Sequence, residues 1–358
     1  MTDLSPLLVL IRETAVLIVI YAIYVLGLNL VAGQLGLPQF GKVMFLALGG
    51  FVVGGIMVKL VLLIHSSYII QKFGVDPLKN IGEYCSVYQI FIKSEIERIF
   101  LINPAEGILF FLFSLILAAV VAGVFGILMA GPALRLREDY LGILLLVSAE
   151  ALRVVTTYTP ELACGVFGTY IPDPFIWLGD GRPWGFFIIS VLIFIFIFIL
   201  MERLVNSPFG RSLRAIRDAE TAARVFGKDI VKYRTRALAI ASAVGGVAGA
   251  LFAFYRGFVI MSEYVPLYTF IAWAMLVIGG MGNNVGALVG AAVYITVDRL
   301  ISLNKEAIQR VVEVDPINVQ YMIFGLLIIL ILLYRPQGIV AEKPTKTLSK
   351  EELERLRK

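Results

Sequence analysis

Hydrophobic residues in this chain gather in long runs that charged residues rarely interrupt. The clearest runs are 43–64, 107–129, 184–201 and 319–334. An α-helix needs roughly 20 predominantly apolar residues to cross a hydrocarbon core of about 30 Å, and these runs approach or exceed that length. The pattern therefore predicts an all-α, polytopic membrane protein.

The pattern predicts about nine membrane-spanning helices, with a range of about eight to ten because the boundaries shift by a few residues. The fourth span carries Glu150 and Arg153, and the seventh and eighth are short and rich in glycine where they meet. The expected spans are 14–32, 43–64, 107–131, 139–157, 184–202, 237–255, 267–281, 285–303 and 318–334.

The polar segments divide the chain into one membrane domain, 1–341, and a short charged soluble tail, 342–358. The composition supports a membrane domain, because 59% of the residues are hydrophobic and 16% are charged. Soluble domains have about 45–50% hydrophobic and about 25% charged residues. The first span lacks the pattern of a cleaved signal peptide and is expected to be retained. Residues 65–106 are expected to form an extracytoplasmic helical insertion, as an interfacial helix or a partner-contact surface.

The distribution of Lys and Arg orients the chain, because cytoplasmic loops hold the excess of these residues. The segment 203–236 is the richest, and placing it inside also places the basic tail from Arg335 inside. Lys42, Arg135 and Arg137 then count as cytoplasmic as well. This predicts an N-terminus outside the cell and a C-terminus in the cytoplasm.

Redox, metal and nucleotide chemistry have no support in the residues. Cys85 and Cys164 are too few for a disulfide framework or a four-ligand metal cluster, and His65 is the single histidine. The two cysteines can pair, since the topology places both outside. No phosphate-binding loop or convergent catalytic set occurs, so neither a cofactor nor enzymatic activity is expected.

Two further patterns have simple structural interpretations. The net charge is +5, and the basic residues lie in loops between spans. Membrane orientation therefore explains the charge more simply than nucleic-acid binding does. The glycines of segment 279–286 superficially suggest a dinucleotide loop, but they lie between two apolar spans. A tight turn with closely packed helices is the favoured interpretation.

The most informative hydrophilic segment is 207–236. Asn206 or Ser207 can cap a helix that Pro208 opens, and Gly227 offers a stop signal. This predicts one or two short helices parallel to the membrane on its cytoplasmic side. Their small apolar face suits a socket on a partner protein, while a basic loop that only enforces topology is the alternative.

Residues 220–227, ETAARVFG, resemble the cytoplasmic motif through which ABC importer permeases engage their ATPases. The wider string SPFGRSLRAIRDAETAARVFGKDIVKYR is similar to the LivM-type subunit of the branched-chain amino acid permease family. The generic motif continues to a leucine-proline pair, where this chain has Ile230-Val231-Lys232-Tyr233.

Further strings resemble the same family in the same order along the chain. They are LGLNLVAG at 26–33, GPALRLREDYL at 131–141, GGMG at 279–282 and RPQG at 335–338. The chain departs from the family in the length of segment 65–106 and in CGVFG at 164–168, where a Thr-Gly-Gly turn is expected.

The resemblance implies a permease subunit of an ABC importer in the cell membrane of a prokaryote, translocating branched-chain amino acids. The implied partners are a LivH-like second permease, two LivG/LivF-like ATP-binding subunits and an extracytoplasmic amino-acid-binding protein, within the lipid bilayer. The residues expected to couple to the ATPases are Arg211, Arg214, Arg217, Glu220, Ala222, Ala223 and Gly227.

Polar residues inside spans are candidates for the substrate path, because such residues generally face protein or water. Glu150 and Arg153 can pair at i, i+3 spacing or contact a zwitterionic substrate. Asn29 can bond a neighbouring helix or contact substrate, and the first interpretation is favoured. Two other functions stay open: a urea or short-chain amide permease of the same architecture, and a secondary transporter or channel without an ATPase.

Overall fold

The computed structural model describes residues 4–133, 138–306 and 316–342. The predictions on Arg135, Arg137 and nearly all of the charged tail lie outside these ranges. In the described part, helices account for most of the chain, and the only strands are β1 (Thr169–Tyr170) and β2 (Phe258–Val259), which pair antiparallel.

The nine expected spans all fall on helices. Seven of the described helical segments are long and apolar enough to cross a membrane, and they match the first six expected spans and the eighth. The seventh and ninth fall on shorter apolar helices, Leu267–Gly279 and Asn318–Tyr334. The helices that carry the spans are α1 (Leu4–Leu28), α2 (Lys42–Phe51), α3 (Val58–Ile64), α7 (Pro104–Ala133), α8 (Glu138–Tyr158), α10 (Arg182–Asn206), α13 (Ile230–Arg256), α14 (Leu267–Gly279), α15 (Asn284–Leu303) and α17 (Pro316–Tyr334).

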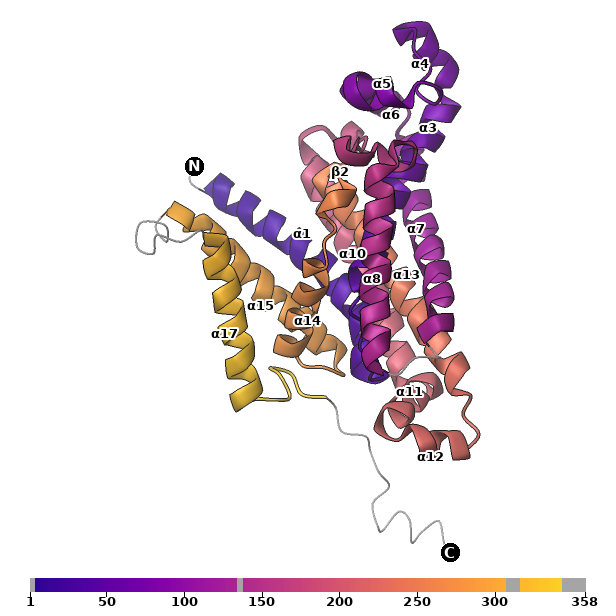
Figure 1. The fold of residues 1–358 in the computed structure, drawn as a ribbon. Coiled ribbons are helices and arrows are strands. Elements are labelled where there is room, and N and C mark those ends of the chain that lie inside the picture. The colour runs from indigo at the N-terminus through magenta and orange to yellow at the C-terminus, as the bar shows by residue number, and fades with distance from the viewer. Residues whose placement is uncertain (1–3, 134–137, 307–315, 343–358) are drawn as a thin grey trace, which may run out of the picture.

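Short helices lie mainly at the two ends of the molecule. One end carries α4 (Ser66–Phe73), α5 (Ile81–Glu83) and α6 (Gln89–Ile102), which we call the cap (Figure 1). The other end carries α11 (Pro208–Asp218) and α12 (Glu220–Val225), and the described chain ends nearer to them than to the cap. The first described turn of α1 lies toward the cap end. The segments 65–106 and 203–236, which are expected on opposite sides of the membrane, lie at opposite ends of the structure.

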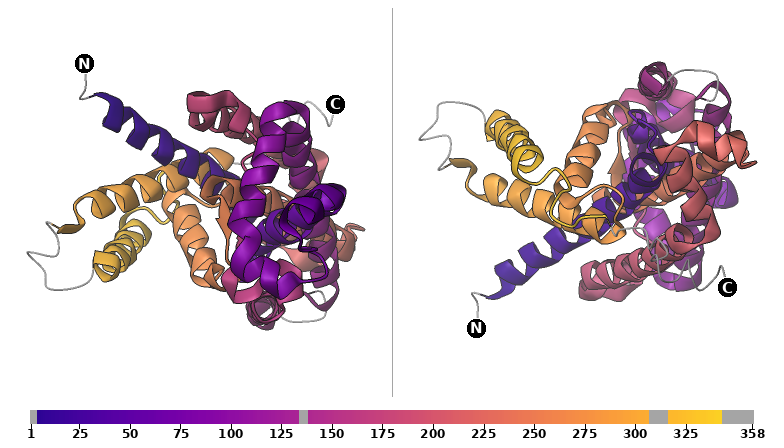
Figure 2. Two further views of the ribbon diagram at one scale, coloured as in Figure 1. Left: turned by 90° about the horizontal axis from the view of Figure 1, so that it is seen from above. Right: turned by 90° about the horizontal axis from the view of Figure 1, so that it is seen from below.

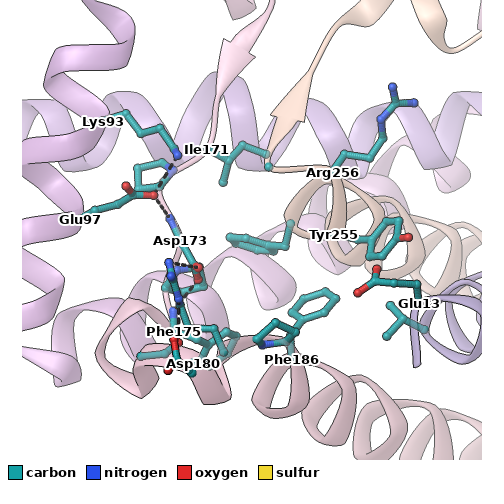
Figure 3. A pocket seen from close by; sticks show the side chains of 18 residues that line it. Glu13, Lys93, Glu97, Ile171, Asp173, Phe175, Asp180, Phe186, Tyr255 and Arg256 are labelled. Atoms are coloured by element: carbon teal, nitrogen blue, oxygen red, sulfur yellow. Dashed lines mark hydrogen bonds and ion pairs between the residues drawn. The ribbon is translucent and has the colours of Figure 1, made fainter. Parts of the chain in front are cut away.

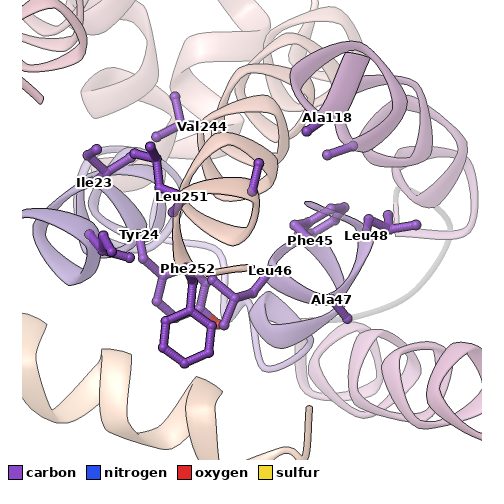
Figure 4. Packing of buried hydrophobic residues seen from close by; sticks show 14 of the residues in the cluster. Ile23, Tyr24, Phe45, Leu46, Ala47, Leu48, Ala118, Val244, Leu251 and Phe252 are labelled. Carbon is purple, nitrogen blue, oxygen red and sulfur yellow. The ribbon is translucent and has the colours of Figure 1, made fainter. Parts of the chain in front are cut away.

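The core forms around α13, which packs most extensively against α7, α2 and α1. Figure 4 shows Tyr24 of α1, Phe45 of α2 and Ala118 of α7 pointing toward α13. Small residues permit this contact, because a Cβ added at Gly249 would lie 2.0 Å from the carbonyl oxygen of Leu46. The helices α15 and α17 lie to one side of this core, as seen from both ends in Figure 2.

The cap is joined covalently to the rest of the chain. Cys85 and Cys164 form a disulfide across 79 residues of sequence, a pairing that the sequence left open. The side chain of Gln89 adds a second link, donating to the carbonyl oxygen of Gly168 at 3.0 Å and accepting from the amide of Tyr170 at 3.2 Å. Cap and body are therefore held together at two adjacent points.

Lys42 does not contribute a cytoplasmic surface charge, contrary to the count of basic residues above. Its side chain is fully buried at the start of α2, where Nζ donates to the carbonyl oxygen of Ala241 at 2.7 Å. The rings of Tyr24 and Phe45 lie within 6 Å of the same nitrogen. The positive-inside pattern still holds without it, because it depends mainly on segment 203–236.

Candidate coupling site

The two short helices of segment 207–228 form as the sequence predicts. Ser207 caps α11, its hydroxyl accepting from the amide of Phe209 at 3.2 Å, and Pro208 occupies the first turn. The helix α12 ends at Val225, and Gly227, one residue beyond the cap at Phe226, has a φ of +76°, which suits glycine. The amide of Lys228 then bonds to the carbonyl oxygen of Ala223 at 3.1 Å, which is the closing bond of a Schellman motif.

The end of α12 presents an apolar tip. Val225 is 85% exposed and Phe226 is 82% exposed, while Ala223 behind them is buried. Exposed side chains of this kind at a helix end, away from the apolar spans, indicate a surface for another protein. Ala222 beside them is also exposed, so the tip has a small-residue side as well.

Two of the expected coupling arginines turn toward the body of the protein. Arg214 donates from Nη1 to Oε1 of Gln34 at 2.9 Å, and Arg217 donates from Nη1 to the carbonyl oxygen of Gly33 at 2.6 Å. Both acceptors belong to the π-helical turn Asn29–Gln34 that ends the first span. The two arginines therefore join α11 to the end of that span, and Arg211 is the one that stays exposed.

The π-helical turn continues the connection into the neighbouring helices. The side-chain nitrogen Nε2 of Gln34 donates to the carbonyl oxygen of Gly282 at 2.5 Å, and Oδ1 of Asn29 accepts from the backbone amide of Gly282 at 2.9 Å. Nδ2 of Asn29 also donates to Oδ1 of Asn284 at 2.9 Å. Nδ2 of Asn284 in turn donates to the carboxylate of Glu202, near the end of α10, at 3.0 Å. The coupling network, Arg214–Gln34–Gly282–Asn29–Asn284–Glu202, thus links α11 to three apolar helices.

Arg217 also binds the last described residues of the chain. It forms ion pairs with Glu342 at 3.2 Å and with Asp218 at 3.0 Å. Burial opposes the charge of Arg217, but the hydrogen bonds that it donates to these two carboxylates outweigh this effect and raise the pKa of the guanidinium. The segment after α17 is therefore held against α11.

Glu220 stabilises the coupling segment internally. Its carboxylate pairs with Arg224 at 3.1 Å and with Arg234 at the start of α13 at 2.8 Å. Half-buried and paired in this way, it fixes α12 relative to α13. Its contact with an ATPase stays a prediction, as do the contacts expected for the other coupling residues.

The polar residues expected along the substrate path make intramolecular contacts. Arg153 pairs with Glu150 through two nitrogens, the Nε bond being 2.9 Å long, and also donates to the carbonyl oxygen of Ser262 at 3.3 Å. Asn29 makes the interhelical bond that was favoured for it. A role for these three residues in contacting substrate remains a prediction.

Sequence reasoning missed Gln34, Gly282, Asn284, Glu202 and Glu342 as parts of this network. The turn 279–286 was recognised as a tight connection, and it is one: Gly280 and Gly282 have positive φ, and Asn283 caps α15. The available signal was the placement of polar residues at the ends of apolar runs, since such residues need partners. Which partner each finds depends on the three-dimensional packing.

The arrangement joins the helix pair α11 and α12 to the ends of several apolar helices through hydrogen bonds. No group of three or more His, Cys, Asp or Glu that could hold a metal ion occurs among the described residues. The apolar helices are long enough to span a membrane and are packed through small residues. These features define a multi-pass membrane protein.

A family model described as "Branched-chain amino acid transport system / permease component" matches residues 10–332. The chain belongs to this family of branched-chain amino acid transport permeases, as the resemblance in its motifs indicated.

Individual relatives agree with this assignment. The chain is 35% identical over 332 residues to a probable branched-chain amino acid transport permease protein LivM of Methanocaldococcus jannaschii, with 92% of each chain covered. It is 26% identical over 249 residues to the high-affinity LivM permease proteins of Salmonella typhimurium and Escherichia coli, covering 63% of this chain and 56% of those proteins. No solved structure matches the chain.

Proposed function

We propose that this chain is the transmembrane permease subunit of an ABC importer that takes up branched-chain amino acids. An extracytoplasmic binding protein delivers the solute, a second permease completes the path, and two ATP-binding subunits drive it. The observation that carries the proposal is the pairing of an exposed apolar tip at Val225 and Phe226 with the inward bond from Arg214 to Gln34. One contact faces outward to a partner and the other inward to the spans.

The proposed mechanism is a rigid-body movement. An ATPase that holds the tip of α12 would move α11 with it, because α11 and α12 pack against each other. Arg214 and Arg217 then carry that displacement to the π-helical turn of the first span. Hydrogen bonds from this turn reach α10 and α15, so several spans move together between outward- and inward-open states.

The proposed orientation follows from the same contacts. ATP is hydrolysed in the cytoplasm, so the end carrying α11 and α12 is cytoplasmic, and the basic residues of segment 203–236 agree with the positive-inside rule. The cap then lies outside the cell, where the disulfide between Cys85 and Cys164 is stable.

The test is uptake by the complete system in proteoliposomes. The chain is co-purified with the second permease, the ATP-binding subunits and the binding protein of its own organism, and entry of radiolabelled L-leucine is followed. We expect ATP-dependent leucine uptake that ionophores leave unchanged. Stimulation of ATP hydrolysis by urea or acetamide instead of leucine would favour the amide permease. Uptake that follows an ion gradient without ATP would favour a secondary transporter.

A further inference from the structure

A cavity of about 600 Å³ lies at the cap end of the molecule. Its wall combines α6 of the cap, the segment after β1, the middle of α1, the start of α10 and the end of α13 (Figure 3). The volume falls within the range of about 300–1,000 Å³ that is typical of small-molecule sites. The coupling site lies at the opposite end of the protein, so the two features are separate.

One side of the cavity carries two acidic and two basic side chains. Lys93 pairs with Glu97 at 3.0 Å, and the same carboxylate accepts from the backbone amide of Asp173 at 2.9 Å. Arg182 lies 3.8 Å from the carboxylate of Asp173. Glu13, Asp180 and Arg256 line other parts of the cavity. The charged side chains therefore carry both signs, so a ligand with one cationic and one anionic group can find a partner for each.

Asp173 is incompletely compensated within this set. Burial raises the pKa of its carboxyl, although one oxygen accepts from the amide of Phe175 at 2.8 Å. The separation of 3.8 Å from Arg182 exceeds hydrogen-bond length. A cationic group entering the cavity would therefore relieve the desolvation of Asp173, and an anionic group could engage Arg182 in its place.

The rest of the wall is apolar. Phe175, Phe186 and Phe254 line it together with Val16, and Phe175 packs on Phe186 with ring centroids 6.5 Å apart. Figure 3 shows the ring of Phe186 near Phe175 and between Asp173 and the first helix. An aliphatic side chain placed against these rings would be removed from water while its polar end faced the charges.

We propose that this cavity binds a zwitterionic aliphatic amino acid at the extracytoplasmic end, with its ammonium on Asp173, its carboxylate on Arg182 and its side chain against Phe186. The proposal rests on the proposed function, since it names a holding site for the solute that the importer carries. Two features define the ligand: opposite charges in adjacent places, at Asp173 and Arg182, and an apolar wall beside them.

The test measures binding to the full chain in lipid nanodiscs by isothermal titration calorimetry, without ATP or partners. The probes are L-leucine, the cation leucinamide and the anion 4-methyl-2-oxopentanoate. We expect leucine to bind about tenfold or more tightly than either singly charged analogue, because each analogue leaves one charge of the site unmatched. Equal binding of leucinamide and leucine would overturn the zwitterion assignment, and so would the absence of measurable leucine binding.

The site is located with the Asp173→Asn variant, which removes the charge and keeps the shape. We expect leucine binding to weaken by about tenfold or more, with Glu83→Gln on the exposed surface of the cap as a control that binds like the unaltered chain. Phe186→Trp is the second variant. We expect it to weaken the binding of leucine more than the binding of alanine, because the larger indole fills the space proposed for the leucine side chain. Unchanged binding in either Asp173→Asn or Phe186→Trp contradicts the proposed site.

The two proposals fail in different ways. If the reconstituted system imports leucine with ATP while Asp173→Asn binds leucine normally, the permease function stands and this site is wrong. If the chain binds leucine as expected but no ATP-dependent uptake occurs, the site stands and the importer mechanism is wrong.

Discussion

Nη1 of Arg214 lies 2.9 Å from Oε1 of Gln34, although 180 residues of sequence separate them. The arginine belongs to the helix expected to engage an ATPase, and the glutamine is fully buried at the end of the first span. Because Gln34 also donates to the carbonyl oxygen of Gly282, it connects α11 to the α14–α15 turn with one side chain. A displacement of α11 therefore cannot leave the first span unaffected while these bonds hold.

Replacement of Gln34 by leucine should destabilise the protein by about 1–3 kcal/mol, because the variant leaves Arg214 and the carbonyl of Gly282 without this partner. The interaction free energy between Gln34 and Arg214 is obtained from a double-mutant cycle with Arg214→Ala, in which the free energy of unfolding is measured in mild detergent. We expect the two changes to be non-additive by about 0.5 kcal/mol or more. Arg211→Ala, on the exposed side of the same helix, should be nearly neutral, and strict additivity of the first pair would show that the bond contributes nothing.

The Phe226→Asp change should abolish co-purification of the ATP-binding subunits. A carboxylate at this 82% exposed position places an unpaired charge in an apolar interface, which is costly to bury. The fold should be unaffected, because the side chain has few contacts within its own chain. Phe91→Asp is the matched control, since it alters an exposed phenylalanine of the cap and should leave the assembly intact; retention of the ATPases by Phe226→Asp would show that the tip of α12 is not their contact.

Reduction of the disulfide between Cys85 and Cys164 should lower stability by about 2–4 kcal/mol, because the bridge closes a long loop of 79 residues. The chain contains two cysteines, so a reductant acts on this bond alone. Thermal unfolding with and without reductant measures the effect. The double variant C85A/C164A should unfold at the lower temperature in both conditions, and a response of that variant to reductant would contradict the assignment.

Asp173 should make the unaltered chain more stable at mildly acidic pH. Burial raises its native pKa above the ordinary value of 3.8, so the native state holds the proton more tightly than the unfolded chain. Its contribution to unfolding free energy therefore rises as pH falls from above the native pKa toward 3.8, and it is constant below that. Unfolding midpoints of the unaltered chain and of Asp173→Asn, compared across this window without amino acid, should converge toward low pH; parallel curves would contradict the shift.

The fold was largely predictable because membrane spans depend on apolar length, which the sequence displays directly. The caps at Ser207 and Gly227 were also predictable, since they act through bonds to neighbours a few residues away. Lys42 shows where prediction from the sequence fails. A lysine beside an apolar run is expected to be a cytoplasmic surface charge, yet tertiary packing buries Lys42 against the carbonyl group of Ala241. Composition cannot distinguish the two outcomes.

The candidate coupling site was predictable only in its local part. The segment containing Glu220 and Gly227 was located by resemblance, but the contacts of Arg214 with Gln34 and of Arg217 with Gly33 were not predicted. Nothing in the spacing of these residues reveals a contact across 180 positions of sequence. The charged cavity beneath the cap was missed for the same reason, because several separate elements bring its side chains together.

The most direct test of the proposed coupling is the number of leucine molecules imported per ATP hydrolysed by the reconstituted system, measured for the unaltered chain and for Gln34→Leu. The network requires that this ratio fall by about tenfold in the variant while ATPase binding and basal hydrolysis are retained, because the spans no longer follow α11. An unchanged ratio in a correctly assembled Gln34→Leu complex would contradict transmission through the first span.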